Sequence, residues 1–247
     1  MSDIYVGFFG EIIMKTKLSN PFKTLSKTEL AIWLISSVAI IISYLLPEST
    51  SWPNLIDALI GVTALIFIAK GNVFGQFLMV TFCIIYAFIA LSFHYYGEMI
   101  IYFCMHIPIC TVSIVTWLKN PNGDKKSEVK IAPLTVKKIA VMLVLGAVIT
   151  TAFYFILKAL GTANLIPSTI SVLTSFMALY LQAARSPMFA AVFLANDLVL
   201  IIMWIAAAMT DASYLPMVIC FSAFLLNDGY GFFNWTRMKK RQEKENA

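Results

Sequence analysis

Long apolar segments alternate with short polar stretches along almost the whole chain. Eight such segments cover residues 29–46, 54–69, 72–93, 98–118, 139–160, 165–183, 187–209 and 213–235. A helix rises about 1.5 Å per residue, so roughly 20 apolar residues are enough to cross the hydrocarbon core of a bilayer. The pattern therefore predicts an all-α polytopic membrane protein with eight transmembrane helices, of which the second is the shortest.

Basic residues are distributed unevenly between the two sets of alternate loops. With the N-terminus in the cytoplasm, 17 of the 18 lysines and arginines lie on the cytoplasmic side, and Lys158 alone lies outside. Positive charge close to span ends is retained in the cytoplasm during insertion. We therefore expect both termini in the cytoplasm. The first span is expected to be retained, because residues 1–27 lack the continuous apolar core of a signal peptide.

Composition supports the membrane assignment and argues against other classes of function. The chain is 60% hydrophobic and 13% charged, with a mean hydropathy of +0.83, which is more apolar surface than a soluble domain of 247 residues can bury. Insertion topology already accounts for the net charge of +5, so nucleic-acid binding is not expected. The sequence contains no glycine-rich phosphate loop, which argues against an ATP-driven pump in this chain.

The cysteines give no sign of a metal or redox site. Cys83, Cys104, Cys110 and Cys220 all lie within apolar spans, without the CxxC spacing of metal ligands. We therefore expect buried free thiols, and neither a metal nor a cofactor.

The ends of spans four and eight resemble each other. Trp117 and Trp235 are each preceded, four residues earlier, by a small residue and followed two residues later by a base. Each half also carries a lone base between its first and second helices, Lys70 or Arg185, and the base-to-tryptophan separations are 47 and 50 residues. This joint pattern predicts an internal duplication of three helices.

Three is an odd number, so a single helix between the repeats is needed to keep them parallel. The predicted divisions are a cytoplasmic N-terminal segment (1–27), an additional helix (28–53), the first repeat (54–118), a cytoplasmic loop with a linker helix (119–163), the second repeat (164–236) and a cytoplasmic tail (237–247). The loop should contain a turn and then a solvated charged stretch. Parallel repeats of this kind occur in SWEET transporters, whose site lies between the repeats near the bilayer midplane.

Two polar residues interrupt span seven close to its middle. Asn196 and Asp197 lie roughly 15 Å from the cytoplasmic end of the span. An ionised carboxylate at that depth costs at least about 2.5 kcal/mol, so Asp197 should face a cavity or a partner. It either serves a cationic ligand or is a neutral acid bonded between helices. Thr174, at mid-depth in span six, can face the same cavity as Asn196 or bond its own helix.

Span eight presents several polar groups on one helical face. Asn227, Tyr230, Gly231 and Trp235 follow the spacing i, i+3, i+4 and i+8. An amide, a phenol and a glycine that permits close approach suit a planar polar ligand. Asp228 points to a neighbouring face, where it can pair between helices. Trp235 and its counterpart in span four are favoured as interfacial belt residues.

The remaining polar candidates lie in spans three, four and seven. Gln76 and Tyr86 interrupt span three, and Trp204 lies on the same face of span seven as the midplane amide. Trp204 either stacks on an aromatic substrate or packs against other helices. Glu98 and His106 are eight residues apart on one face of span four, which is compatible with a proton relay.

Together these residues resemble the PnuC family of bacterial nicotinamide riboside transporters. The resemblance is carried by GQFLM at 75–79, YYGEM at 95–99, NLIPSTIS at 164–171, ND at 196–197 with Trp204, and NDGYGFFNW at 227–235. These stretches extend over nearly the whole predicted core, and their specificity lies in the combination. One departure is Phe189, where other branches of the family carry tryptophan.

The resemblance implies a SWEET-like 3+1+3 fold and a homotrimer in the bacterial inner membrane. It implies facilitated diffusion of nicotinamide riboside for NAD biosynthesis, driven by a separate cytoplasmic kinase that phosphorylates the riboside, and no enzymatic activity of the transporter itself. The expected substrate-binding residues are Asn196, Asp197, Asn227, Tyr230, Thr174, Trp204, Gln76 and Tyr86. Asp197 would offset the pyridinium charge, and the amides would bond the carboxamide or the ribose.

Three alternatives remain at this point. Thiamine is also an aromatic cation, so a related uniporter for thiamine or riboflavin fits the same features. A proton-coupled symporter would differ only in its energetics. An intramembrane enzyme using His106 and Glu98 lacks a metal-ligand constellation or a recognisable nucleophile–base pair.

Overall fold

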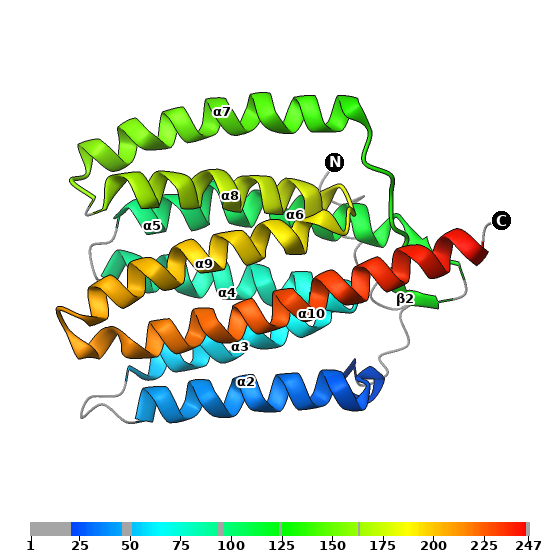
Figure 1. Ribbon diagram of the computed structural model, residues 1–247, viewed down its shortest axis with the longest axis horizontal. Helices are drawn as coiled ribbons and strands as arrows, with labels where there is room; N and C mark the ends of the chain where they lie inside the picture. The colour runs from blue at the N-terminus through cyan, green and yellow to red at the C-terminus, as the bar shows by residue number, and fades with distance from the viewer. Residues whose placement is uncertain (1–20, 46–50, 93–95, 124, 163, 246–247) are drawn as a thin grey trace, which may run out of the picture. The chain divides into compact units, whose positions relative to one another are not determined.

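The computed structural model describes residues 21–45, 51–92, 96–123, 125–162 and 164–245 (Figure 1). The chain forms two compact units, residues 1–31 and 32–247. Most of the predicted N-terminal segment, as far as residue 20, lies outside the described residues.

The described part of the smaller unit, residues 21–31, contains the beginning of the first long helix. A 3₁₀ turn, Pro21–Thr24, precedes α2, Lys27–Leu45. The Ser26 N–H donates to the Glu29 carboxylate at 2.6 Å, and the Glu29 N–H donates to the Ser26 hydroxyl at 3.3 Å. This reciprocal pair is a capping box, which satisfies two N–H groups that a helix start leaves without partners.

The larger unit is almost entirely helical. Its elements after α2 are α3 (Trp52–Ala69), α4 (Val73–Ser92), α5 (Tyr96–Ile101), the π turn η2 (Tyr102–His106), α6 (Ile107–Leu118), β1 (Pro121–Asn122), β2 (Lys125–Val129), α7 (Val136–Ala159), α8 (Leu165–Ala183), α9 (Met188–Ala208), the 3₁₀ turn η3 (Ala212–Tyr214) and α10 (Leu215–Glu245). Among the described residues, eight helices are long and apolar enough to cross a membrane, with α5, η2 and α6 counted as one. This confirms the eight predicted spans.

The fourth span contains a break in its regular helix. The π turn η2 ends two residues before Pro108, which has no N–H to donate and therefore cannot continue the regular ladder. The ring of His106 lies within this turn and stacks on the ring of Tyr102, with centroids 4.4 Å apart. π turns of this kind occur frequently at functional sites.

The helices pack as the duplication predicts. Within the first repeat α3 packs on α4 and α4 on α6, and within the second α8 packs on α9 and α9 on α10. Between the repeats, α10 packs on α3 and α6 on α8, so the last helix of each repeat contacts the first helix of the other. The linker helix α7 lies along α8 (Figure 1). The order fits a 3+1+3 arrangement.

Equivalent corners end the first helix of each repeat. Gly71 follows α3 with φ 71°, and Arg185 follows α8 with φ 60°. The Gly71 N–H donates to the Ile68 carbonyl at 2.8 Å, and the Arg185 N–H donates to the Gln182 carbonyl at 3.0 Å. Arg185 is therefore the structural counterpart of Gly71. The sequence pattern had matched Arg185 with Lys70, which is one residue earlier.

Each repeat's tryptophan bonds to the other repeat's corner. The Trp235 indole N–H donates to the carbonyl oxygen of Ile68 at 2.9 Å, and the Trp117 indole N–H donates to that of Gln182 at 3.0 Å. Trp235 is 0% exposed and Trp117 2%. The prediction of interfacial belt residues is thus wrong, because the indole N–H groups find partners at helix ends, where backbone carbonyls lack intrahelical donors.

The loop before α7 closes over both corners. We call residues 128–132 the strap. The Val129 N–H donates to the Gly71 carbonyl at 3.0 Å, and the Ala132 N–H donates to the Arg185 carbonyl at 3.1 Å. One extended segment therefore bonds to equivalent atoms of the two repeats. The predicted solvated charged stretch is wrong at Val129, which is only 2% exposed.

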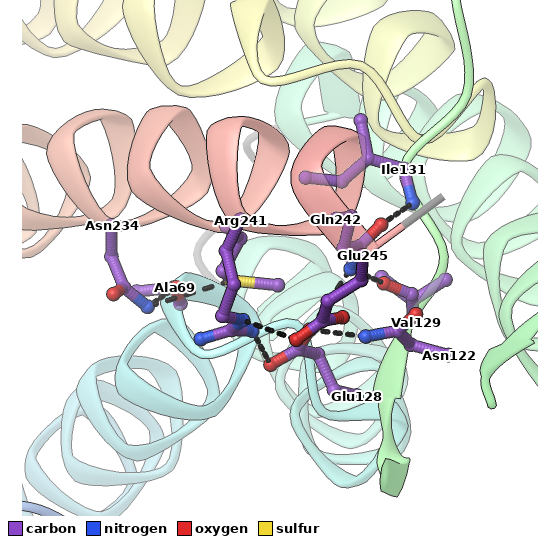
Figure 2. Close-up of polar contacts among 10 residues, drawn as sticks. Ala69, Asn122, Glu128, Val129, Ile131, Asn234, Arg241, Gln242 and Glu245 are labelled. Carbon is purple, nitrogen blue, oxygen red and sulfur yellow. Dashed lines mark hydrogen bonds and ion pairs between the residues drawn. The ribbon is translucent and has the colours of Figure 1, made fainter. Parts of the chain in front are cut away.

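The end of α10 holds the strap in place (Figure 2). The Gln242 side chain accepts a hydrogen bond from the Ile131 N–H at 2.8 Å and donates to the Val129 carbonyl at 3.1 Å. Arg241 forms an ion pair with Glu128, to which Gln242 also donates. Residues beyond Trp235, predicted as a tail, are therefore a helical extension as far as Glu245.

The cysteine prediction holds for three of the four thiols. Cys83, Cys110 and Cys220 are buried and free, but Cys104 is exposed on the π turn. A side chain in an apolar span can face lipid as readily as protein, so hydropathy does not separate the two cases.

Candidate functional site

The amide of Asn196 lies at the centre of a cluster of hydroxyl groups. Its Oδ1 atom accepts hydrogen bonds from Thr174 at 2.7 Å, from Ser171 at 3.1 Å and from Ser175 at 3.2 Å. Three donors on one oxygen fix the orientation of the amide, leaving its Nδ2 group as the donor for other partners. The structure therefore brings together Asn196 and Thr174, as their predicted depths suggest.

Asp197 is paired with a second acid. The carboxyl groups of Asp197 on α9 and Asp228 on α10 interact with each other, and the side chains are 3% and 5% exposed. The Oδ2 atom of Asp197 has no hydrogen-bond partner in the described part of the chain. Two carboxyls in such proximity cannot both ionise readily, so the pair favours a shared proton and a single negative charge.

A pair of buried amide side chains joins the two repeats. The Gln182 side chain donates to Oε1 of Gln76 at 3.0 Å, and the two side chains are 2% and 0% exposed. The Nε2 group of Gln76 has no partner among the described residues. Gln182 was not among the predicted site residues. Its signal is the same as that of Gln76, an amide within an otherwise apolar span.

Asn227 is fully buried and only half satisfied. Its Nδ2 group donates to the Ser36 hydroxyl at 3.1 Å and to the Ala223 carbonyl at 2.8 Å. Its Oδ1 atom has no partner within the described chain. On the same predicted face, Gly231 lies against Ala69, where an added Cβ would be 3.4 Å from the alanine Cβ. The glycine thus serves the close approach of α10 to α3.

The aromatic candidates lie in a separate cluster. Tyr86 packs on Tyr102, with ring centroids 4.3 Å apart, and on Phe82, at 5.8 Å. Trp204 stacks on Phe221, with ring centroids 6.4 Å apart. Tyr86, Trp204 and Tyr230 are all half-buried. Tyr86 and Trp204 both pack against the hydrophobic cluster that contains Phe82 and Phe221.

Asp57 on α3 is a buried acid that sequence analysis missed. Its side chain is 2% exposed, and its Oδ1 atom has no hydrogen-bond partner among the described residues. The available signal was a carboxylate at the fourth residue of the shortest apolar segment, 54–69. A position so near one end of a span does not by itself indicate burial, because acids are common where a span meets water.

The buried polar groups define what this interior can bind. Unpartnered acceptors on Asp57, Asp197 and Asn227 and an unpartnered donor on Gln76 come from four different helices. A buried polar group without a hydrogen-bond partner destabilises the folded protein by about 1–3 kcal/mol. Each of these atoms is therefore a candidate for hydrogen bonding to a ligand or a water. Within the described residues no lysine or arginine is buried, and no group of three or more His, Cys, Asp or Glu could hold a metal.

Eight membrane-length helices in two parallel repeats, with polar groups between them, define the class of a multi-span membrane transporter. The family model described as "Nicotinamide mononucleotide transporter" matches residues 51–237. The chain therefore belongs to that family, and it is a transporter and not an enzyme. The match begins at residue 51, after α2.

Individual relatives agree with the family assignment. A nicotinamide riboside transporter PnuC from Neisseria mucosa is 25% identical over 215 residues, covering 85% of this chain and 82% of the relative. One of the same name from Haemophilus influenzae is 26% identical over 211 residues, covering 85% and 90%. The crystal structure of a vitamin B3 transporter PnuC has the same fold, with a TM-score of 0.74, 24% identity, and coverage of 88% of this chain and 94% of that one.

Proposed function

We propose that this protein carries nicotinamide riboside across the bacterial cytoplasmic membrane. The observation that carries the proposal is the set of unpartnered amide and carboxyl atoms buried between the helices. Nicotinamide riboside combines a pyridinium cation with a carboxamide and ribose hydroxyls, which are the complements of those groups. The family match and the names of both relatives support the same substrate.

Each predicted site residue has a proposed role. Asn196, held by three hydroxyls, presents its amide N–H group to a ribose or carboxamide oxygen. The free oxygen of Asn227 accepts from a ribose hydroxyl or the carboxamide, and the free N–H of Gln76 donates to the carboxamide oxygen. Asp197, with its partner Asp228, offsets the pyridinium charge. Tyr230, Trp204 and Tyr86 contribute aromatic lining.

The charge of the interior favours the riboside over its 5′-phosphate. The buried acids Asp57, Asp197 and Asp228 would repel the phosphate of nicotinamide mononucleotide, and the described residues bury no lysine or arginine to neutralise it. The mononucleotide in the family's description is therefore not the substrate proposed for this chain.

We infer facilitated diffusion, with both termini and the strap in the cytoplasm. The positive-inside distribution supports this orientation. A separate kinase that phosphorylates the riboside would trap it inside and feed NAD biosynthesis. A homotrimer remains a prediction from the family resemblance.

Proton-coupled symport is the second candidate, favoured by one observation. The Asp197–Asp228 pair joins α9 and α10 of the second repeat and can hold or release a proton, as acids in proton-driven transporters do. It is distinguished from facilitated diffusion by its driving force, which a vesicle experiment measures.

Isothermal titration calorimetry of the purified protein tests the substrate. We expect binding of nicotinamide riboside, and binding at least a hundredfold weaker for nicotinamide mononucleotide, thiamine and riboflavin. Asn196→Ala and Asn227→Ala should each weaken riboside binding tenfold or more. Preference for thiamine or for the mononucleotide would keep the fold and overturn the proposed substrate.

A further inference from the structure

Asp57 lies at the opposite end of α3 from the tryptophan pair. It is in the first two turns of α3, whereas Ile68, which accepts from Trp235, is in the last turn of the same helix. The rise of a helix places their backbones roughly 16 Å apart along α3. The residues around Asp57 form a hydrophobic cluster of their own, including Leu55, Ala58 and Phe82.

The surroundings of Asp57 are aromatic. They include the ring of His106, which stacks on that of Tyr102, but no lysine or arginine is buried among the described residues. Asp57 lies in α3 between Leu55 and Ala58, which belong to the hydrophobic cluster against which Tyr86 and Tyr102 pack. The half-buried Glu98 precedes Tyr102 by four residues, about one helical turn. Two acids thus lie beside one pair of tyrosines. Those rings are 4.3 Å apart between centroids, and Phe82 packs against both, at 5.8 Å and 6.1 Å.

This combination is chemically suited to an organic cation. A carboxylate attracts the charge, and the faces of electron-rich rings attract it further through their quadrupoles. A buried acid with an unpartnered oxygen is unfavourable unless something compensates it. In α3 nothing of opposite charge does so, because Asp57 is the only charged residue between Trp52 and Ala69.

We propose that Asp57, Tyr86 and Tyr102, with Glu98 at the rim, form a separate binding station for the pyridinium ring, at the end of the bundle opposite the strap. This inference rests on the proposed function, since it takes the riboside as the substrate. In the proposed orientation this end is external, so the station selects the cationic ring before the riboside reaches Asn196 and Gln76. Selection for positive charge is then assigned to Asp57, and recognition of the carboxamide and ribose to the deeper amides.

The test compares a charged ligand with its uncharged form. Nicotinamide riboside and its reduced form, dihydronicotinamide riboside, have the same substituents, but only the first carries a ring charge. We expect Asp57→Asn to weaken calorimetric binding of the riboside at least tenfold and to leave binding of the reduced form within twofold. Glu98→Gln should act in the same direction, by about threefold.

Asp211→Asn is the matched control. Asp211 is an exposed acid in the connection before η3, and the N–H of Ser213 holds the pKa of its carboxyl below the usual range, so that it is ionised at neutral pH. Its substitution should change binding of neither form. Thermal unfolding of Asp57→Asn, measured in detergent, should occur no earlier than for the unsubstituted protein, because asparagine has nearly the same size as the buried aspartate and cannot ionise.

The outcomes separate this inference from the proposed function. If the unsubstituted protein binds the riboside and Asp57→Asn binds it equally well, or loses both forms in equal proportion, the station is wrong and the substrate stands. If the unsubstituted protein does not bind the riboside, the proposed function and the station are both overturned.

Discussion

The rings of Trp117 and Trp235 meet with their centroids 5.3 Å apart, although 118 positions separate them in the chain. Each belongs to one repeat and donates its indole N–H to the corner of the other. The T-shaped contact of Phe189 with Trp235, at 4.9 Å between centroids, adds a third ring. The two repeats are thus joined by a reciprocal exchange of side chains.

Trp235→Phe and Trp117→Phe should destabilise the protein to a similar degree. Each change keeps most of the ring and removes one buried hydrogen bond, at a cost of about 1–3 kcal/mol. Thermal unfolding in detergent measures the effect. Trp52→Phe, at a position 59% exposed, is the control and should change stability little. Equal stability of all three variants would show that the exchanged bonds contribute nothing.

Gln242→Ala should release the strap without unfolding the helices. The change removes the side chain that accepts from Ile131 and donates to Val129, so the amides of residues 128–132 should exchange hydrogen faster, by tenfold or more. Mass spectrometry of the corresponding peptides measures this. Lys244→Ala, on the exposed side of the same helical extension, should leave the rates unchanged. Unaltered protection in Gln242→Ala would mean that the corner carbonyls hold the strap alone.

Thr174→Val should weaken riboside binding severalfold. Valine keeps the shape of the side chain but removes the shortest of the three hydrogen bonds to Asn196, so the amide is held less firmly. Thr169→Val is the matched control in the same helix, because that hydroxyl donates only to the Leu165 carbonyl among the described groups. Calorimetry measures riboside binding by both variants. An equal loss of affinity in the two would assign the effect to α8 as a whole and not to the hydrogen bond with Asn196.

Gly75→Ala should prevent folding, whereas Gly229→Ala should stabilise the protein. A Cβ on Gly75 would lie 2.6 Å from both the Ala64 carbonyl oxygen and the Ile68 amide nitrogen, backbone atoms that cannot move aside. At Gly229 the nearest atom is 3.9 Å away, so alanine should gain about 1 kcal/mol of helix propensity. Yield and thermal unfolding of both variants test the close packing of α4 on α3.

A pH gradient alone should not drive uptake. In protein-containing vesicles with equal riboside on both sides, facilitated diffusion predicts no accumulation, whereas symport through the Asp197–Asp228 pair predicts accumulation on the alkaline side. Asp228→Asn provides the internal check. Accumulation that this substitution abolishes would replace facilitated diffusion by proton coupling.

Hydropathy was sufficient to locate the helices, because length and apolar content alone determine whether a segment can cross a bilayer. The repeated tryptophan pattern and the bases near it predicted a 3+1+3 order, which the helix packing fits. The meeting of Thr174 with Asn196 followed from depth, since residues at one level on neighbouring helices can contact each other.

The rotation of each helix about its own axis could not be predicted from the sequence. In a membrane the lipid-facing side is as apolar as the packed side, so periodicity does not show which residues point inwards. The burial of Trp235, the exposure of Cys104 and the pairing of Asp197 with Asp228 all depend on that rotation. The inter-repeat partner of Gln76 also required a register between helices far apart in the chain.

The strap restricts which motions can serve transport. Val129 and Ala132 are three residues apart, so their amide nitrogens stay within roughly 10 Å of each other, and the two bonded corner carbonyls within roughly 17 Å, while both bonds persist. While the strap is bonded, we expect the two repeats to tilt relative to each other about the strap, which would separate the ends of the helices farthest from it. In the proposed orientation the strap lies at the cytoplasmic end, and we expect these hydrogen bonds to break before the riboside leaves on that side, so their lifetime would limit the rate of turnover.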